Sequence, residues 1–314
     1  MKTESVSPLQ QARASYQPKT PLAFRSSQLR VLETEVVLPE SDRDEIQGQF
    51  PNTFGKPLVE ISEGDGNLNS SPLVVGVVLS GGPAAGGHNA IAGLYDALKK
   101  ANPRSKLYGF TGGPKGVFTG KYKELNDATI DAHRNTGGFD MIGSGRDKIE
   151  TAEQLAGCKK TMAELGASAL VVIGGDDSNT NAAILAEYFQ AEKVPVQVIG
   201  LPKTIDGDMR NEYIEASFGF DSAARTYAEL VGNICRDARS ARKYYHFVKL
   251  MGRSASHVPL EVALQVQPNY TIISEEVEAR SISFSGIVEE IVDMVIKRSE
   301  AGKNYGVVLV PEGL

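Results

Sequence analysis

The sequence predicts a doubly wound α/β fold, in which helices cover both faces of parallel sheets. From residue 73 onward, short and almost continuous apolar runs recur, and most of them end in glycine, proline or polar residues. Stretches long enough to form helices separate most of these runs. Parallel strands that are covered on both faces read as continuous apolar runs, and their alternation with helices is typical of this fold class.

We expect strands at residues 73–79, 107–110, 140–142, 169–173, 196–201, 246–250, 271–273 and 306–310. We expect helices at residues 89–100, 152–165, 180–189, 222–236 and 285–299. Ligands of such folds bind at the carboxyl ends of the strands, so the loops that follow the strands are where chemistry is expected.

Residues 1–71 differ from the rest of the chain. They contain several prolines, many polar residues and an acidic stretch at 40–45, with little sustained periodicity. We interpret them as an N-terminal extension that is partly ordered against the body or against a partner subunit. The α/β pattern that follows is divided into a first domain at 72–217 and a second domain at 218–314.

Composition limits the classes of partner. The 314 residues carry a net charge of −6 with acids and bases well mixed, which favours neither nucleic acid nor a membrane surface as a partner. The two cysteines, Cys158 and Cys235, give no disulfide framework and no metal-ligand spacing. With no run of about 18 apolar residues and no hydrophobic N-terminal region, we expect a cytoplasmic protein.

The first expected post-strand loop is glycine-rich, with the sequence SGGPAAGGHN at 80–89. Glycines allow tight turns and let backbone N–H groups approach an anion at a helix N-terminus. The loop matches neither the dinucleotide fingerprint nor the P-loop, and a purely structural turn is the alternative. His88 could contact a phosphate here, whereas we expect the other histidines to be structural or on the surface.

The second loop, GGDDSNTN at 174–181, follows another apolar run and contains two adjacent carboxylates. Asp176 and Asp177 would repel each other unless one of them met a cation, and Mg²⁺ typically takes one or two carboxylates together with water and phosphate oxygens. Helix capping is the alternative, and it explains one acid better than the pair.

The third loop, PKTIDGD at 202–208, combines a cation, a hydroxyl and two carboxylates. A carboxylate near a sugar hydroxyl can act as a general base in phosphoryl transfer, and a lysine can offset charge on the transferring phosphates. The alternative is a solvated surface ion pair between Lys203 and Asp206.

Two shorter loops complete the set: MGRS at 251–254 and PEG at 311–313. Arg253 supplies a planar donor that is suited to phosphate or sugar oxygens. Glu312 could accept hydrogen bonds from sugar hydroxyls. Each loop could equally be an ordinary surface loop.

Taken together and in this order, GGDD at 174–177, PKTIDGD at 202–208, MGR at 251–253 and PEG at 311–313 resemble the phosphofructokinase family over residues 73–314. Asp177 and Lys203 resemble the diphosphate-using branch in particular, because ATP-using relatives have glycine at both positions. A side chain at 177 would crowd and repel the α-phosphate of a nucleotide, and Lys203 would add positive charge for a diphosphate. The glycine loop also resembles the long form of that branch.

The resemblance implies a phosphofructokinase-like fold and a reversible, Mg²⁺-dependent transfer from diphosphate to the 1-hydroxyl of fructose 6-phosphate. It implies that Asp206 is the proton acceptor, that Lys203 stabilises the transition state, that Asp177 selects diphosphate over ATP and that Asp176 holds Mg²⁺. The implied diphosphate-binding residues are Gly81, Gly82 and Arg146. The implied substrate-binding residues are Thr204, Ile205, Asp206, Asp208, Lys243, Tyr244, Met251, Gly252, Arg253 and Glu312.

The same resemblance implies a homo-oligomer with shared active sites, because Lys243 and Tyr244 match positions that reach into a neighbouring subunit. Residues 72–217 would bind diphosphate and Mg²⁺, and residues 218–314 would be part of the sugar-phosphate domain. Family members continue beyond PEG, so we expect this chain to be the N-terminal, catalytic half, with an incomplete second domain. The alternatives are a non-catalytic regulatory subunit and an ATP-dependent kinase. A dinucleotide-dependent oxidoreductase is disfavoured because its fingerprint is missing.

Overall fold

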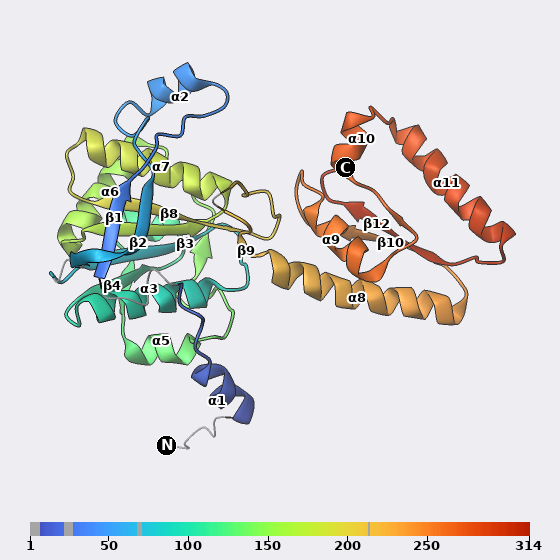
Figure 1. Ribbon diagram of the computed structural model, residues 1–314, viewed down its shortest axis with the longest axis horizontal. Coiled ribbons are helices and arrows are strands. Elements are labelled where there is room, and N and C mark those ends of the chain that lie inside the picture. Colours follow the sequence, from blue (N-terminus) through green and yellow to red (C-terminus); the bar gives the residue numbers. More distant parts are fainter. Residues whose placement is uncertain (1–6, 22–27, 68–70, 213) are drawn as a thin grey trace. The chain divides into compact units, whose positions relative to one another are not determined.

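A computed structural model describes residues 7–21, 28–67, 71–212 and 214–314. The chain forms two compact units, residues 1–201 and residues 202–314, which are called the N-terminal and C-terminal units below (Figure 1). The division predicted between residues 217 and 218 stays a prediction.

The main sheet is mostly parallel. It contains β3 (Val74–Ser80), β4 (Lys106–Phe110), β5 (Tyr122–Leu125), β6 (Ser144–Gly145), β7 (Ala169–Gly174), β8 (Gln197–Thr204) and β9 (Phe218–Gly219). The strand order is β5-β4-β3-β7-β8-β9, with the short β6 also paired to β3. β3 lies parallel to β4, β6 and β7, whereas β5 is antiparallel to β4.

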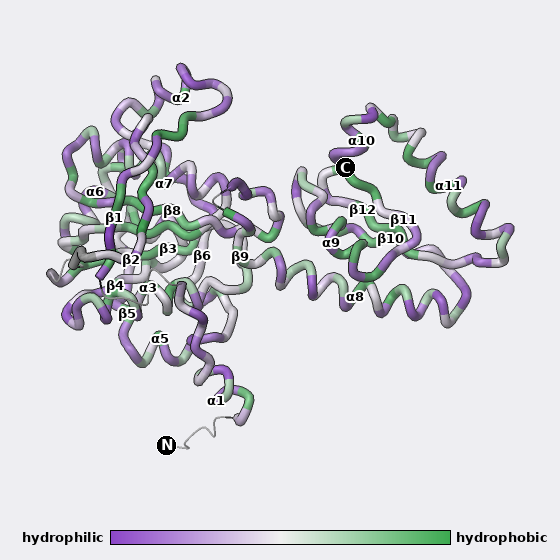
Figure 2. The backbone as a smooth tube through the Cα atoms, in the orientation of Figure 1, coloured by the Kyte–Doolittle hydropathy of each residue, from purple (hydrophilic) through white to green (hydrophobic). Residues whose placement is uncertain are grey.

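Helices cover both faces of this sheet in the N-terminal unit (Figure 1). α3 (Gly87–Ala101) and α5 (Asp127–His133) lie on one face, and α4 (Pro114–Thr119), α6 (Ala152–Leu165) and α7 (Asp176–Ala191) lie on the other. The strands are the most hydrophobic part of the unit (Figure 2). Phe110, Met162, Leu170 and Phe189 are fully buried between the sheet and α6 and α7, which fixes the strand ends that carry the site.

The N-terminal residues add an antiparallel ribbon and two helices. β1 (Gln28–Glu33) pairs with β2 (Val59–Asn67); α1 (Pro8–Ser15) precedes β1 in the sequence, and α2 (Arg43–Gln49) lies between the two strands. The backbone N–H groups of Asn52 and Thr53 donate to the Glu187 carboxylate on α7 at 3.0 and 2.9 Å. The Asn135 amide donates to two carbonyls at the end of α1, so the segment has polar contacts with the body at two places.

The C-terminal unit has a smaller parallel sheet. Its elements are α8 (Phe220–Ala241), β10 (Tyr245–Leu250), α9 (His257–Val266), β11 (Tyr270–Thr271), α10 (Ser274–Ala279), α11 (Phe284–Glu300) and β12 (Gly306–Pro311). The strand order is β10-β12-β11, and α8 and α11 lie on opposite sides of the sheet (Figure 1). Val231, Leu250, Val258 and Leu309 form its core.

The predicted doubly wound α/β architecture is confirmed, and four local predictions are corrected. Residues 140–142 form no strand, because the backbone N–H groups of Asp140 and Met141 donate to the His88 ring instead. The third predicted helix, at residues 180–189, begins too late, because α7 already begins at Asp176. β8 continues through Thr204, since Lys203 and Thr204 pair with β9. β5 departs from the expected parallel pattern at the sheet edge.

No helix among the described residues is both long enough and apolar enough to span a membrane.

Candidate active site

The glycine loop begins where β3 ends. Gly81 adopts φ 85°, a left-handed conformation that favours glycine, and its N–H donates to the Gly145 carbonyl at 2.9 Å. A Cβ on Gly82 would lie 3.3 Å from the Arg146 guanidinium, so these two residues are close neighbours. The N-terminal unit therefore brings all three predicted diphosphate-binding residues together.

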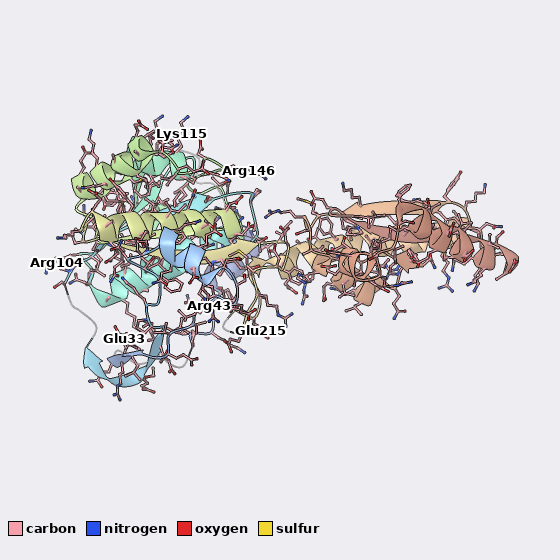
Figure 3. All side chains as sticks on the ribbon, turned by 90° about the horizontal axis from the view of Figure 1, so that it is seen from above. Glu33, Arg43, Arg104, Lys115, Arg146 and Glu215 are labelled. Atoms are coloured by element: carbon pink, nitrogen blue, oxygen red, sulfur yellow. The ribbon has the colours of Figure 1, made fainter. Side chains whose placement is uncertain are left out.

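Arg146 is exposed at the rim of this unit, directly after β6 (Figure 3). Arg104, which precedes β4, lies at the opposite end of the same unit (Figure 3). Arg146 thus extends the carboxyl edge of the parallel strands, where ligands of doubly wound sheets bind. Its guanidinium is a donor that can bind two phosphate oxygens at once.

The two carboxylates of the second loop form the first turn of α7. Both Asp176 and Asp177 are exposed, and the N-cap is Gly175, so neither of them caps the helix as its N-cap residue. The Ser178 hydroxyl donates to Ser80 at 2.8 Å and ties this turn to the end of β3. A Cβ on Gly174 would lie only 2.3 Å from the Ser178 side chain, so glycine is required for this approach.

Asp177 has a neighbour that the sequence did not single out. The Lys148 ammonium lies 4.0 Å from the Asp177 carboxylate, and both side chains are more than half exposed. An exposed pair of this kind contributes little stability. The pair nevertheless places the Lys148 ammonium, two residues after Arg146, beside the first turn of α7 that carries Asp176 and Asp177.

The donor set at this turn fits a magnesium ion. Asp176 offers one exposed carboxylate beside a second, and Mg²⁺ binds through one or two carboxylates while keeping water and phosphate oxygens as its other ligands. No three His, Cys, Asp or Glu side chains within the described ranges are grouped so that they could hold a metal ion.

The C-terminal unit begins with the third predicted loop, and there the cation is buried. Lys203 is 5% exposed and Thr204 is 9% exposed, because both belong to β8 and pair with β9. Ser217 donates to the Thr204 carbonyl at 2.8 Å and fixes the strand end further. Burial excludes the alternative of a solvated surface ion pair between Lys203 and Asp206.

Asp206 is the buried carboxylate of this segment, at 7% exposure. Its backbone N–H donates to the Thr204 hydroxyl at 3.1 Å. Burial, and then the charge of Asp208, raise the pKa of Asp206, while the Thr204 hydroxyl and Arg253 oppose the shift. A carboxylate that is desolvated in this way is a stronger base than an exposed one. Ile205, which lies between Thr204 and Asp206 in the sequence, is half-buried, and Asp208 is exposed.

The fourth and fifth loops interlock through one carboxylate. Glu312 accepts hydrogen bonds from the backbone N–H groups of Gly252 and Arg253, each at 3.1 Å, and these bonds lower the pKa of Glu312. Gly252 has φ 148° and Arg253 has φ 52°, so the turn is held in a conformation that L residues adopt reluctantly. A Cβ on Gly313 would lie 1.9 Å from the Arg253 carbonyl, which explains the glycine after Glu312. Met251, which precedes this turn, is exposed.

Lys243 and Tyr244 lie apart from these loops. They precede β10, whereas Met251 follows its last residue, and a six-residue strand separates the two ends by about 20 Å. Both residues are exposed, and Tyr244 has φ 66°. The C-terminal unit therefore groups Asp206, Arg253 and Glu312 electrostatically but does not bring Lys243 and Tyr244 to them.

Comparisons with known proteins agree with this architecture. The family model for phosphofructokinase matches residues 74–314. The pyrophosphate--fructose 6-phosphate 1-phosphotransferase of Porphyromonas gingivalis is 54% identical over 308 residues, which cover 98% of this chain and 56% of the relative. Subunit beta 2 of the enzyme of that name from Arabidopsis thaliana is 53% identical over 273 residues, covering 86% of this chain and 48% of that protein.

The chain thus spans about half the length of these relatives. A crystal structure of the pyrophosphate-dependent phosphofructokinase of Nitrosospira multiformis aligns with a TM-score of 0.66 at 22% identity, over 78% of this chain and 61% of that one. The predicted resemblance and the predicted fold are both confirmed. The chain belongs to the phosphofructokinase family.

Proposed function

We propose that the protein that carries this chain transfers a phosphoryl group reversibly between diphosphate and the 1-hydroxyl of fructose 6-phosphate. The observation that carries the proposal is the pair of buried charged residues at the end of β8, Lys203 and Asp206. The names of the relatives support the same reaction.

Asp206 would accept the proton of the sugar hydroxyl. The hydroxyl oxygen would then form a bond to one phosphorus atom of diphosphate as the bridging P–O bond breaks and phosphate leaves. A buried carboxylate with a raised pKa suits this role, because its ionised form is a stronger base than that of an exposed carboxylate. No covalent phosphoenzyme is needed, since the transfer is a matter of positioning and charge neutralisation.

Lys203 would stabilise the charge that develops on the phosphates, and its burial strengthens this interaction by excluding water. Asp176 would hold Mg²⁺, which neutralises charge on the diphosphate when it is bound. Gly81, Gly82 and Arg146 would bind diphosphate through backbone N–H groups and the guanidinium.

Asp177 would select the donor. Its carboxylate is 71% exposed at the first turn of α7, and it would repel the additional phosphate of a nucleotide. On this reasoning, diphosphate is the preferred donor and ATP the disfavoured one.

Fructose 6-phosphate would contact Thr204, Ile205 and Asp208 on one segment and Met251, Gly252, Arg253 and Glu312 on the other. Glu312 holds the turn at Gly252 and Arg253, so its loss would disturb the sugar site even where it makes no contact itself. Lys243 and Tyr244 would reach a neighbouring subunit's site, so a homo-oligomer is part of this proposal. A cytoplasmic location is also part of it.

The test is a coupled assay of the purified protein with fructose 6-phosphate, diphosphate and Mg²⁺, in both reaction directions. We expect turnover with diphosphate that disappears when Mg²⁺ is chelated. A protein that binds both substrates but shows no turnover, and that activates a second chain instead, would be a regulatory subunit and would contradict the proposal.

A further inference from the structure

His88 is a buried histidine whose two ring nitrogens both bind the segment at 136–141. It is 2% exposed at the start of α3. Its Nε2 accepts hydrogen bonds from the backbone N–H groups of Asp140 at 3.0 Å and Met141 at 2.9 Å. Its Nδ1 lies 2.7 Å from the Thr136 hydroxyl. Because two backbone N–H groups donate to Nε2, this nitrogen carries no proton, although an Asp140 carboxylate oxygen also lies 3.0 Å from it, and Nδ1–H donates to Thr136.

The backbone around the ring is fitted to it. The His88 N–H donates to the Gly138 carbonyl at 2.9 Å, and the Gly86 N–H donates to the Gly137 carbonyl at 3.0 Å. A Cβ on Gly138 would lie 2.5 Å from the imidazole, so no other residue could bring this backbone so close. The start of α3 and the segment at 136–141 are therefore joined along several residues.

The segment at 136–141, which binds the His88 ring, leads directly to the proposed diphosphate-binding residues. Five residues after Met141 the chain reaches Arg146, and the Gly145 carbonyl in between accepts the N–H of Gly81. Gly82 lies beside the Arg146 guanidinium. The ring thus anchors a stretch whose other end sets the position of Arg146 relative to the glycine loop.

We propose that neutral His88 is a positioning residue for the diphosphate site, because it anchors residues 136–146 against the glycine loop. The inference rests on the proposed function for the identity of the ligand. His88 itself does not contact the reacting atoms in this role. This positioning role takes the place of the expectation that His88 contacts a phosphate.

Protonation would break the arrangement. A charged ring has no acceptor for the two backbone N–H groups, and its Nε2–H could donate instead to the Asp140 carboxylate, whose oxygen lies 3.0 Å away. The titratable groups that face His88 are His133, whose ring lies edge-on at 4.9 Å, and Asp140. Burial, and then His133, lower the pKa of His88, while Asp140 opposes the shift. The neutral ring is therefore the form present at neutral pH.

The test compares His88→Leu, His88→Gln and Tyr95→Phe in the purified protein. Leucine removes the acceptor, whereas the glutamine amide oxygen can take the place of Nε2. Tyr95 is buried on the same helix, and its hydroxyl donates to Asp127 at 2.6 Å, away from the anchored segment. Tyr95→Phe therefore controls for general damage to α3.

For His88→Leu we expect faster hydrogen exchange of the amides of Asp140 and Met141, measured without substrates. We also expect a KM for diphosphate that rises about tenfold to a hundredfold, with the KM for fructose 6-phosphate unchanged. His88→Gln and Tyr95→Phe should keep both the amide protection and the KM for diphosphate near wild type.

The pH dependence separates positioning from packing. As the pH falls through the lowered pKa of His88, the KM for diphosphate should rise more steeply in the wild type than in His88→Gln, because only the wild type protonates at this position. Both proteins share the ionisation of the substrate, so the difference between them reports on His88.

Unchanged amide exchange in His88→Leu, or equal effects on both KM values, would overturn the inference. The same is true if Tyr95→Phe reproduces the defect in diphosphate binding. Failure of the proposed function looks different, because the wild type itself would then show no turnover with diphosphate.

Discussion

The Asp206 carboxylate is buried and lies near both acidic and basic side chains, and these surroundings determine its basicity. At 7% exposure its ionised form has lost most of its hydration, and Asp208 adds repulsion. Thr204 and Arg253 only partly offset these effects. Because the raised pKa disfavours the ionised state in the folded protein, this carboxylate lowers stability at neutral pH, a cost that is consistent with the catalytic role proposed for it.

The first prediction concerns Asp206→Asn. Loss of the general base should reduce kcat by about 10² to 10⁴-fold. The melting temperature at neutral pH should stay equal or rise, because the cost of the buried charge is removed. This gain should shrink as the pH falls through the raised pKa, where the wild-type carboxyl becomes protonated. A calorimetric scan at neutral and acidic pH checks the stability, and a marked loss of stability at neutral pH would contradict this account.

The second prediction concerns Asp208→Asn. Removing this negative charge should lower the pKa of Asp206, so the acidic limb of the pH–kcat profile should shift to lower pH. Glu278→Gln, an exposed acid on α10 and not among the charges that shift Asp206, is a control and should leave the limb in place. A shift to higher pH in Asp208→Asn would have the wrong sign.

At the scale of elements, helix α6 shows what a sequence can specify. Its predicted bounds match the structure, because strong local signals mark both ends. Thr151 and Gln154 form a reciprocal capping box, and Gly166 ends the helix in the left-handed conformation. α7 begins earlier than expected because Gly175 takes the N-cap position without a side-chain bond, and a polar first turn resembles a loop.

The third prediction tests this capping. Thr151→Ala should lower the free energy of unfolding by about 1 kcal/mol, because the N–H of Gln154 loses its acceptor. Lys160→Ala removes only an exposed pair with Glu164 on the same helix, and it should change stability by less than about 0.5 kcal/mol. Denaturant unfolding of both variants gives the comparison. Equal losses would show that the cap contributes nothing specific.

Contacts that are distant in sequence explain most of what the sequence could not provide. β8 extends through Thr204 because Lys203 and Thr204 pair with residues fifteen positions further along the chain, and the local sequence at 202–204 does not indicate this pairing. The Lys148–Asp177 pair and the ring of His88 on residues 140 and 141 join segments that are 29 and more than 50 residues apart. By contrast, the carboxyl-edge rule alone placed Gly81, Asp176, Asp206 and Arg253 at strand ends.

At the scale of the whole molecule, each unit has its own hydrophobic cluster. Gly81 and Asp176 follow β3 and β7, whose residues are almost all buried, whereas Asp206 and Arg253 follow β8 and β10, which are partly exposed. Strands that are held in place by packing and by pairing suit a reaction based on positioning.

The fourth prediction follows from this packing. Leu170→Ala, at a fully buried position of β7, should lower the free energy of unfolding by about 2 to 5 kcal/mol. Leu230→Ala on α8 is the matched control, since Leu230 is 57% exposed, and its effect should stay within about 0.5 kcal/mol. Urea unfolding followed by circular dichroism measures both, and a small effect at Leu170 would contradict the assigned core.

Asp177 and Lys203 are proposed to make diphosphate, and not ATP, the phosphoryl donor. The most direct measurement compares kcat/KM for both donors, with fructose 6-phosphate and Mg²⁺, in the wild type and in the Asp177→Gly/Lys203→Gly double variant. We expect the wild type to prefer diphosphate strongly, and the double variant to lose diphosphate activity and to gain activity with ATP relative to diphosphate. A wild type that prefers ATP, or a double variant with an unchanged donor ratio, would contradict the claim.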